Sequence, residues 1–423
     1  MTFEDSREFA EALDRKDPLG TWRDEFNFPI ERNGYSPVYL CGNSLGLQPK
    51  LAAQYVEEEL KNWKDYAVDG HFHSDRPWLS YHRQATTGFA ALTGAKASEV
   101  VAMNTLTVNL HLLMASFYKP TDSRYKILIE SMAFPSDRYA AASQIRLHGH
   151  DPDIGLLEWE PRGDDPTLFL EDLEALLERE GDSIALLLLP GVQYYSGQVL
   201  DMAGICELGR KAGCAVGLDL AHAVGNMALE LHEWAPDFAA WCTYKYLNSG
   251  PGAIGGAFVP ERHFSPGSVD QLHGWWGHDE ATRFEMSRSF TPAKGAELWQ
   301  ISNPPILALA PVAASLRIFQ EAGMPALVAK SKSLTGYLAW LIQERFADRI
   351  ESITPESARG CQLSLRVHDE RVDARLLFDE LCKRNVTGDW REPDVIRVAP
   401  APLYNSHSDV FDFAERLRDA LST

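Results

Sequence analysis

The chain has 423 residues, 45% of them hydrophobic, so it is long enough to bury a large core and to form more than one domain. Its 60 Asp plus Glu against 40 Lys plus Arg give a net charge of -20, which excludes a global attraction to nucleic acid or to anionic lipid. An anionic ligand must therefore be held by a local set of donors, such as a helix N-terminus or a buried Arg.

The amino-terminal residues and the cysteines favour a cytosolic protein. Residues 1–14 are polar and acidic, without the basic patch and apolar run of a signal peptide, so we expect no export. The longest aliphatic run, Ile184 to Leu189, is far too short for a membrane span and is typical of a buried strand. The six cysteines form no CxxC pair and no zinc-site spacing with His, so we expect reduced thiols and no metal site.

From about residue 50 to 300, short apolar runs alternate with longer stretches of helical period, which predicts parallel strands joined by crossover helices. The apolarity of the runs suits strands that are covered on both faces. The predicted strands are Tyr125–Glu130, Ile184–Leu189, Ala215–Asp219, Phe238–Tyr244 and Gly255–Val259. The predicted helices are Asp137–Leu147, Leu168–Arg179 and Met202–Lys211, the last capped by Gly213.

The alternation of short apolar runs and helical stretches changes after Asn303-Pro304-Pro305, where a second, smaller α+β domain is predicted. Its elements are a long helix pair up to about Arg345, strand Gln362–Val367, helix Ala374–Arg384, strand Val395–Val398 and a last helix Asp409–Leu421. We therefore expect an N-terminal segment, 1–50, that packs with the small domain, a large domain, 51–303, and a small domain, 304–423. Because no long linker separates the domains, the cleft between them is the expected binding site.

Two charged residues lie at the carboxyl ends of neighbouring predicted strands. Asp219 is the last residue of strand Ala215–Asp219, and Lys245 directly follows strand Phe238–Tyr244. In open α/β sheets, ligands gather outside these carboxyl ends. Pyridoxal phosphate (PLP) needs a Lys amine to form an imine and an acidic partner that keeps its ring nitrogen protonated. The pair therefore indicates PLP, although an arbitrary Asp/Lys pair is more often a structural ion pair.

Three further sites suit the rest of a PLP enzyme. Asn104-Thr105-Leu106-Thr107 opens an apolar helix, whose free N–H groups could bind the phosphate, although a simple N-cap explains Thr equally. Phe134 could stack on the ring and Asp137 could reach the cofactor, with core packing and helix capping as the alternative. Arg397, within an apolar strand, is the natural clamp for a substrate carboxylate, unless it lies at a surface edge.

A set of motifs, in colinear order from about residue 20 to the C-terminus, strongly resembles the kynureninase family. They are Gly42-Asn43-Ser44-Leu45-Gly46-Leu47-Gln48-Pro49, Leu106-Thr107-Val108-Asn109-Leu110-His111, Phe134-Pro135-Ser136-Asp137, Asp219-Leu220-Ala221-His222-Ala223-Val224-Gly225-Asn226, Tyr244-Lys245-Tyr246-Leu247-Asn248, Gly274-Trp275-Trp276-Gly277-His278, Ile301-Ser302-Asn303-Pro304-Pro305 and Ile396-Arg397-Val398-Ala399-Pro400.

The resemblance implies the aspartate-aminotransferase-like fold, PLP fold type I, with a large, mainly parallel α/β domain and a smaller α+β domain. It also implies a homodimer with active sites at the interface, and hydrolysis of L-kynurenine to anthranilate and L-alanine in tryptophan degradation. By matching positions, Lys245 would be the Schiff-base lysine, Asp219 the partner of the ring nitrogen and Arg397 the holder of the substrate carboxylate. The family's other cofactor positions fall on Leu106, Thr107, Phe134, Asp137, His222, Tyr244, Trp275 and Asn303.

Trp275 and Asn303 would reach a site from the neighbouring subunit. Pro190 departs from the pattern, because some relatives have a Ser there that can contact the cofactor, so Pro190 is left out of the predicted site. Lys245 would move protons between the substrate Cα and C4′ of the cofactor. Tyr244 is the expected acid or base at the carbonyl, with packing against the phosphate as its alternative.

Substrate choice is expected to depend on His71 and the pair Ser302-Asn303, which match positions in eukaryotic-type enzymes where polar groups could bind a ring 3-hydroxyl. We therefore expect 3-hydroxykynurenine to be accepted as well.

Two other functions remain open from the residues. A cysteine desulfurase or selenocysteine lyase would need a mobile nucleophilic Cys in the second domain, and Cys361 is the candidate. It precedes an apolar strand, however, where a free Cys behaves as a small hydrophobe. A non-catalytic PLP-binding regulator would be expected to lack the Lys or the Asp, and both are present.

Overall fold

The computed structural model describes residues 2–265 and 267–422. Its largest sheet has seven strands in the order β4-β10-β9-β8-β7-β5-β6. Their bounds are β4 Val100–Ala102, β5 Lys126–Glu130, β6 Leu156–Trp159, β7 Ile184–Pro190, β8 Ala215–Asp219, β9 Phe238–Trp241 and β10 Gly256–Phe258. The five strands from β9 to β6 are parallel, as predicted, whereas β10 is antiparallel to both of its neighbours.

The direction of β10 corrects the expectation that Gly255–Val259 is a parallel strand. A parallel connection needs a crossover of a dozen or more residues, usually a helix, and no helix lies between β9 and β10. The predicted strand Phe238–Tyr244 is also too long, because β9 ends at Trp241. Lys245 therefore lies in the turn that follows the strand, four residues beyond its end. The prediction for β8 is confirmed to the residue.

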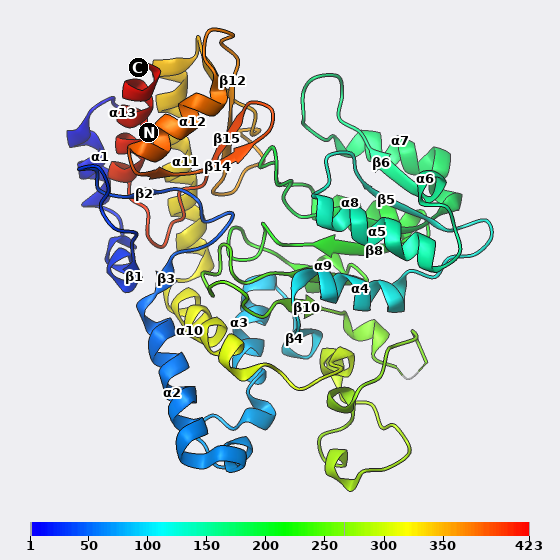
Figure 1. The fold of residues 1–423 in the computed structure, drawn as a ribbon. Coiled ribbons are helices and arrows are strands. Elements are labelled where there is room, and N and C mark those ends of the chain that lie inside the picture. The colour runs from blue at the N-terminus through cyan, green and yellow to red at the C-terminus, as the bar shows by residue number, and fades with distance from the viewer. Residues whose placement is uncertain (1, 266, 423) are drawn as a thin grey trace.

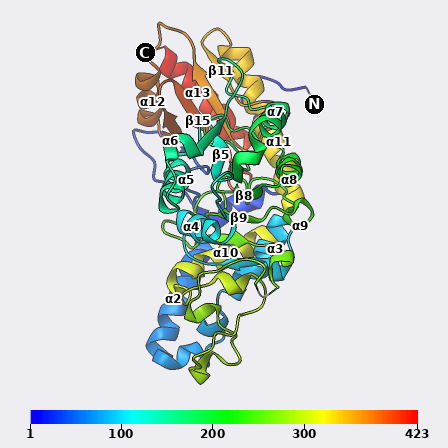
Figure 2. The ribbon, with the colours of Figure 1, turned by 90° about the vertical axis from the view of Figure 1, so that its right-hand side faces the viewer.

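Helices cover both faces of this sheet, which is why its strands are apolar throughout. Leu187 and Leu189 of β7 belong to a core shared with α3, α7, α8 and α10, whereas Leu186 and Leu188 belong to a core shared with α4 and α5. Figure 2 shows α4 and α5 on one side of the sheet and α7 and α8 on the other. The helices are α1 Arg7–Asp14, α2 Lys50–Tyr66, α3 Arg83–Thr93, α4 Leu106–Phe117, α5 Pro135–Leu147, α6 Pro152–Gly155, α7 Leu170–Glu180, α8 Met202–Lys211, α9 Leu231–Trp234, α10 Ile306–Ala322, α11 Met324–Phe346, α12 Ala374–Lys383 and α13 His407–Leu421.

A second sheet forms the part of the molecule at the upper left of Figure 1. Its four strands are antiparallel in the order β11-β12-β15-β14, and their bounds are β11 Ile350–Ser352, β12 Leu363–Val367, β14 Asp389–Arg391 and β15 Val395–Val398. A separate core joins this sheet to α11, α12 and α13. The last helix begins two residues earlier than predicted, because Ser406 and Asp409 form a capping box at its N-terminus.

The N-terminal segment crosses between the two sheets. Its strand β2, Val38–Tyr39, pairs in parallel with β13, Val386–Thr387, beside the second sheet. Ten residues later, β3, Gln48–Pro49, pairs with β1, Phe26–Asn27, and leads into α2. The residues between β2 and β3 therefore run past the space between the sheets.

No single helix among residues 2–265 and 267–422 has both the length and the apolarity of a membrane span, and α10 and α11 have them only together, across a bend of 82°.

Candidate active site

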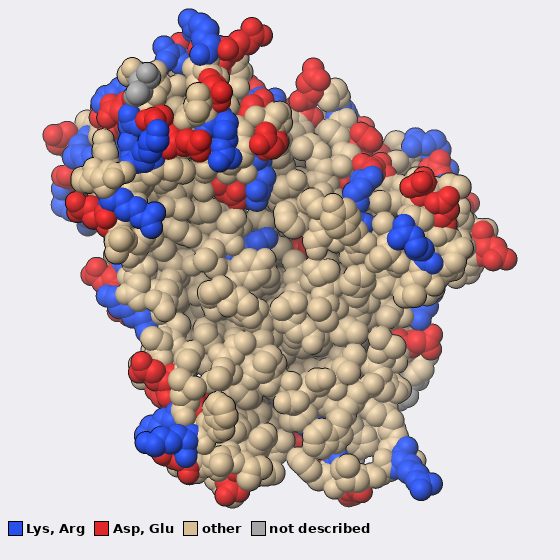
Figure 3. Space-filling view, viewed as in Figure 1, with Lys and Arg blue, Asp and Glu red and all other residues tan. Residues whose placement is uncertain are grey.

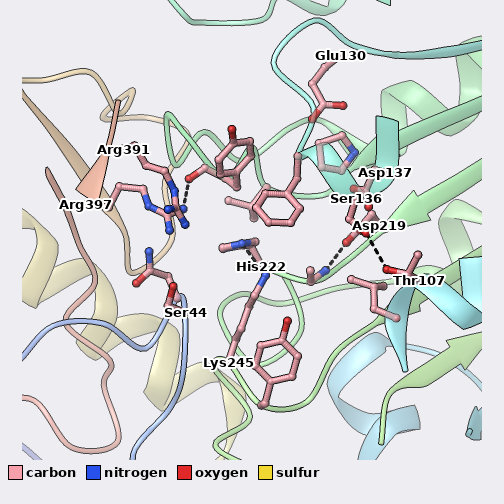
Figure 4. Close-up of a pocket in the computed structure, with 18 of the residues that line it drawn as sticks. Ser44, Thr107, Glu130, Ser136, Asp137, Asp219, His222, Lys245, Arg391 and Arg397 are labelled. Carbon is pink, nitrogen blue, oxygen red and sulfur yellow. Dashed lines mark hydrogen bonds between the residues drawn. The ribbon is translucent and has the colours of Figure 1, made fainter. Parts of the chain in front are cut away.

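A cavity of about 290 Å³ lies at the carboxyl ends of the large sheet, facing the second sheet (Figure 4). Strands β5, β7 and β8 contribute their last residues, α4 and α5 their first turns, and β14 and β15 their arginines. Of the predicted site residues, the lining brings together Leu106, Thr107, Phe134, Asp137, Asp219, His222, Tyr244, Lys245 and Arg397. A cavity therefore lies where the strand ends of the large sheet face the second sheet, which is where we expect a ligand to bind.

The Lys245 side chain projects into this cavity. Its Nζ lies 2.9 Å from Nε2 of His222, a residue that is only 7% exposed. Burial, together with the positive charges of Lys245, Arg397 and Arg391, holds the pKa of His222 well below its usual range. The neutral imidazole can accept a hydrogen bond from the lysine. Its Nδ1 has no partner among the described residues, so one polar atom remains for a ligand.

The turn that carries Lys245 is fixed by the N-terminal segment. The backbone N–H of Gly46 donates to the carbonyl oxygen of Tyr244 at 2.8 Å. A Cβ at position 46 would stand 2.4 Å from the carbonyl oxygen of Lys245 and 2.1 Å from Oδ1 of Asn248. Only glycine allows this approach, so the Gly42–Gly46 motif holds the backbone beside the lysine.

Three carboxyl groups, Glu130, Asp137 and Asp219, form what we call the acidic wall. Oδ1 of Asp219 accepts the backbone N–H of Ala221 at 2.7 Å. Burial raises the pKa of both Asp219 and Asp137, and that of Asp137 is raised further by the charge of Asp219 and a hydrogen bond to it, so the pair shares a proton. Burial also raises the pKa of Glu130 to about 8. The wall therefore holds more carboxyl groups than can ionise together, and the positive charge of a protonated ring nitrogen would balance a carboxylate there.

Hydrogen-bond donors suited to a phosphate group lie where α4 and α5 begin. Thr107, in the first turn of α4, and Ser136, in the first turn of α5, have their hydroxyl oxygens 2.8 Å apart. Two helix N-termini thus converge on one side of the cavity, with their free N–H groups and positive dipole ends. Because Leu106 and Thr107 line the cavity, they fit the predicted phosphate site.

Two guanidinium groups, Arg391 and Arg397, form what we call the basic wall. Arg397 is 1% exposed within β15, so the alternative of a surface-edge arginine is wrong. Its Nη1 donates to the carbonyl oxygen of Tyr194 at 2.6 Å, and its Nη2 pairs with Oδ2 of Asp389. The same Oδ2 accepts from Arg391 at 3.1 Å and from the Ser44 hydroxyl at 2.6 Å.

Four predicted residues lie outside this cavity. The Trp275 side chain is 49% exposed and donates its indole N–H to the carbonyl oxygen of Arg283 at 3.2 Å. Ser302 and Asn303 are exposed just before α10. The His71 ring packs edge-on against Trp78, with 5.2 Å between the centroids. A single chain does not bring these four residues to the lysine, and their roles remain predictions.

The sequence interpretation missed several residues that line the cavity. Glu130 ends a strand, the same pattern that identified Asp219, and Ser136 lies within a motif that was read only through Phe134 and Asp137. Pro190 was left out and lines the cavity nevertheless. Arg391 and Tyr194 carried no signal of their own, because each depends on a neighbour from another part of the chain. Among the described residues no cluster of three or more His, Cys, Asp or Glu could hold a metal ion.

The lysine, the acidic wall and the two helix N-termini suit the amine, the ring nitrogen and the phosphate of PLP, which defines the class: a PLP-dependent enzyme of the aspartate-aminotransferase-like fold. Solved structures share this fold. A C-DES mutant with glycine covalently linked to its PLP cofactor is 15% identical, has a TM-score of 0.76, and the match covers 91% of this chain and 97% of that one. The apo cysteine desulfurase of Thermococcus onnurineus NA1 is 18% identical, has a TM-score of 0.71, and the match covers 97% and 98%.

Closer relatives narrow this class. The kynureninase of Xanthomonas campestris pv. campestris is 53% identical over 419 residues, which cover 99% of this chain and 98% of the relative. That of Myxococcus xanthus is 51% identical over 417 residues, covering 98% and 97%. The family model of the kynureninase C-terminal domain matches residues 327–417, which include both arginines of the basic wall. The chain belongs to the kynureninase family.

Proposed function

We propose that this enzyme hydrolyses L-kynurenine to anthranilate and L-alanine. The observation that carries the proposal is that Lys245, the acidic wall and the basic wall meet in one cavity of a kynureninase family member. PLP, when bound, supplies an electron sink for cleavage of the bond between the side-chain carbonyl and Cβ. Asp219 would hold the ring nitrogen, and Thr107 and the backbone of Leu106 the phosphate. Phe134 and His222 line the same cavity and would contact the ring.

The chain's own groups supply the proton transfers. Lys245 would hold the cofactor through its amine and would carry a proton between the substrate Cα and C4′ of the cofactor. Tyr244 lies beside it, with the Lys245 Nζ 5.9 Å from the centre of the phenol ring. Burial raises the pKa of Tyr244, so the phenol keeps its proton at neutral pH and serves as an acid toward the substrate carbonyl.

The test is to incubate the PLP-loaded enzyme with L-kynurenine and to follow anthranilate fluorescence. We expect turnover by the wild type and none by Lys245→Ala, which removes the anchor. Lys211→Ala, an exposed lysine on α8, is a matched control that should leave turnover unchanged. A PLP-loaded wild type that releases no anthranilate refutes the proposal.

We further propose a homodimer whose subunits share their active sites. The central and lower part of the face in Figure 3 carries few charged side chains. The chain also exposes large apolar side chains, among them Val68 at 71%, Phe284 at 52% and Met286 at 76%. Such a surface is typical of an interface. Trp275 and Asn303 would then serve the neighbour's cavity rather than their own.

A mixing experiment tests the shared site. Lys245→Ala and Asn303→Ala proteins are each expected to have little activity. Unfolded and refolded together, they should recover roughly a quarter of the wild-type activity, because half of the random dimers hold one intact site. Mixtures that recover no activity, although the dimers exchange subunits, contradict the sharing of sites.

We also propose that 3-hydroxykynurenine is a substrate and that His71 and Ser302 bind its ring hydroxyl from the neighbouring subunit. The comparison to make is the ratio of kcat/KM for the two substrates in wild type and in His71→Ala. An unchanged ratio contradicts a role of this histidine in discrimination.

Location and domain roles complete the proposal. All six cysteines are free thiols, which supports a reducing, cytoplasmic environment. Residues 1–50 would function with the small domain, 304–423, because β2 pairs with β13 and α1 packs against α13. The large domain, 51–303, would carry PLP.

The two alternative functions find little support. Cys361 is fully buried outside the cavity, and burial raises the pKa of its thiol to about 12, so it is neither a mobile nor an ionised nucleophile. Lys245 and Asp219 both line the cavity, contrary to what a non-catalytic PLP-binding regulator would be expected to show.

A further inference from the structure

The basic wall carries its own carboxylate. Arg397 is buried and its Nη2 pairs with Oδ2 of Asp389, a side chain that is only 13% exposed. This pair is neutral as a unit, because one guanidinium is matched by one carboxylate. A second carboxylate, that of a substrate, would meet hydrogen-bond donors on Arg397 but no uncompensated positive charge.

Arg391 changes this balance. It lines the same cavity, and its Nη2 lies 3.1 Å from the same Oδ2 of Asp389. Two guanidinium groups and one carboxylate leave a net charge of +1. The Nε atoms of Arg391 and Arg397 are both buried and have no hydrogen-bond partner among the described residues, so the wall also keeps unused donors.

Tyr194 and Ser44 hold the two arginines in place. The guanidinium carbons of Arg391 and Arg397 lie 5.8 and 5.7 Å from the centre of the Tyr194 ring, so one ring supports both. Ser44 donates to Asp389 at 2.6 Å and fixes the carboxylate between them. Figure 4 shows the two arginines side by side above Ser44, on the side of the cavity away from Thr107.

We propose that Arg391 is a specificity-determining residue, which supplies the net positive charge that makes the cavity select an α-carboxylate, while Arg397 and Asp389 form a neutral frame for it. The proposal rests on the proposed function only in requiring an α-amino acid as the ligand. Both arginines line the same cavity as Lys245, so a substrate bound at the lysine would lie in the space that the wall faces.

A merely structural role for Arg391 predicts something different. If this arginine only fixes Asp389, its replacement weakens charged and uncharged ligands alike. If it supplies the net charge, its replacement weakens only ligands that carry a carboxylate. The ratio of the two affinities therefore separates the roles.

The experiment titrates the PLP-loaded enzyme with L-alanine and with L-alaninamide and follows the cofactor's absorbance. For Arg391→Gln we expect about a 10-fold loss of affinity for L-alanine and little change for L-alaninamide, since a charge-assisted contact is lost. Arg391→Lys keeps the charge and should retain most of the preference. Arg371→Gln, an exposed arginine paired with Asp369 in the same part of the chain, is the matched control.

A double variant tests the charge count directly. Asp389→Asn on the Arg391→Gln background restores the net charge of +1 and is expected to recover part of the lost preference for L-alanine. The proposal is overturned if Arg391→Gln keeps the wild-type preference, if Arg391→Lys loses as much of it as Arg391→Gln, or if the double variant recovers none of it. Because L-alanine binding needs no kynurenine turnover, a wild type inactive on kynurenine would refute the proposed function and leave this test intact.

Discussion

The acidic wall and the basic wall solve opposite problems in one cavity. Glu130, Asp137 and Asp219 crowd together at strand ends and a helix start of the large sheet, where burial raises the pKa of all three carboxyl groups. Arg391 and Arg397, on the second sheet, instead share the built-in carboxylate of Asp389. In our proposal the first wall is completed by the positive ring nitrogen of the cofactor, whereas the second keeps one spare positive charge and is completed by the substrate carboxylate. Charge would then separate the two ligands of the enzyme.

The largest effect is expected when the acidic wall loses the carboxylate of Asp219, which would face the ring nitrogen of the cofactor. Asp219→Asn keeps the shape of the side chain but cannot stabilise a protonated ring nitrogen, so we expect kcat to fall on the order of 10²–10³-fold. Anthranilate release measures the effect. Asp137→Asn should cost less, because Asp137 already holds the shared proton, and equal losses in the two variants would contradict the division of roles.

Removing the buried arginine of the basic wall should act on binding instead. Arg397→Gln leaves Arg391 and Asp389 as a neutral pair, and we expect KM for kynurenine to rise by roughly 10- to 100-fold, with a smaller effect on kcat. Steady-state kinetics separate the two constants. A variant that loses kcat at unchanged KM would place Arg397 in the chemical step and break the contrast between the walls.

The buried carboxyl groups of the acidic wall should also lower the stability of the folded, cofactor-free protein. Burial raises the pKa of Glu130 from 4.5 to about 8, so between these values the folded state keeps a proton that the unfolded state releases. Stability therefore falls as the pH rises through this window and is insensitive to this group below it. Glu130→Gln does not titrate, and we expect it to raise the Tm of the cofactor-free protein by a few degrees at pH 8.

The same comparison at pH 5 is the control for Glu130→Gln. There both side chains are nearly neutral in the folded state, and the gain in Tm should nearly vanish. A gain of equal size at both pH values would mean that the effect comes from packing rather than from charge.

The smallest effect is expected outside both walls. Cys361 is buried against Ser331, whose hydroxyl lies 3.3 Å from the sulfur. Cys361→Ala should change kcat/KM less than about 2-fold and lower the free energy of unfolding by about 1 kcal/mol, as for a small truncation in a core. Loss of turnover in a normally folded variant would revive a catalytic thiol.

Much of the large sheet could be predicted because its strands are apolar on both faces and its helices are periodic. Strand β8 and helix α8 were predicted to the residue. The reversal of β10 was not, because strand direction depends on how the chain returns after β9 rather than on the apolar pattern of either strand.

The candidate site, like the sheet, could be predicted from the sequence only in part. Asp219 and Lys245 could be found because one follows the other by one strand-helix-strand unit, and Arg397 because a charge inside an apolar run needs a partner. Arg391 could not, since its role appears only when Asp389, two residues earlier, turns toward Arg397. Trp275 and Asn303 were predicted only through the family resemblance, and in the described chain they lie outside the cavity.

The short segment from Ser44 to Gly46 has a consequence for how the two sheets are spaced. Ser44 is fastened to Asp389 on one side, and two residues later Gly46 is fastened to the backbone at Tyr244 on the other. A chain of this length can span no more than a fixed maximum distance. The segment therefore limits how far the arginines and the lysine can lie apart, and inserting one residue into it would loosen that limit.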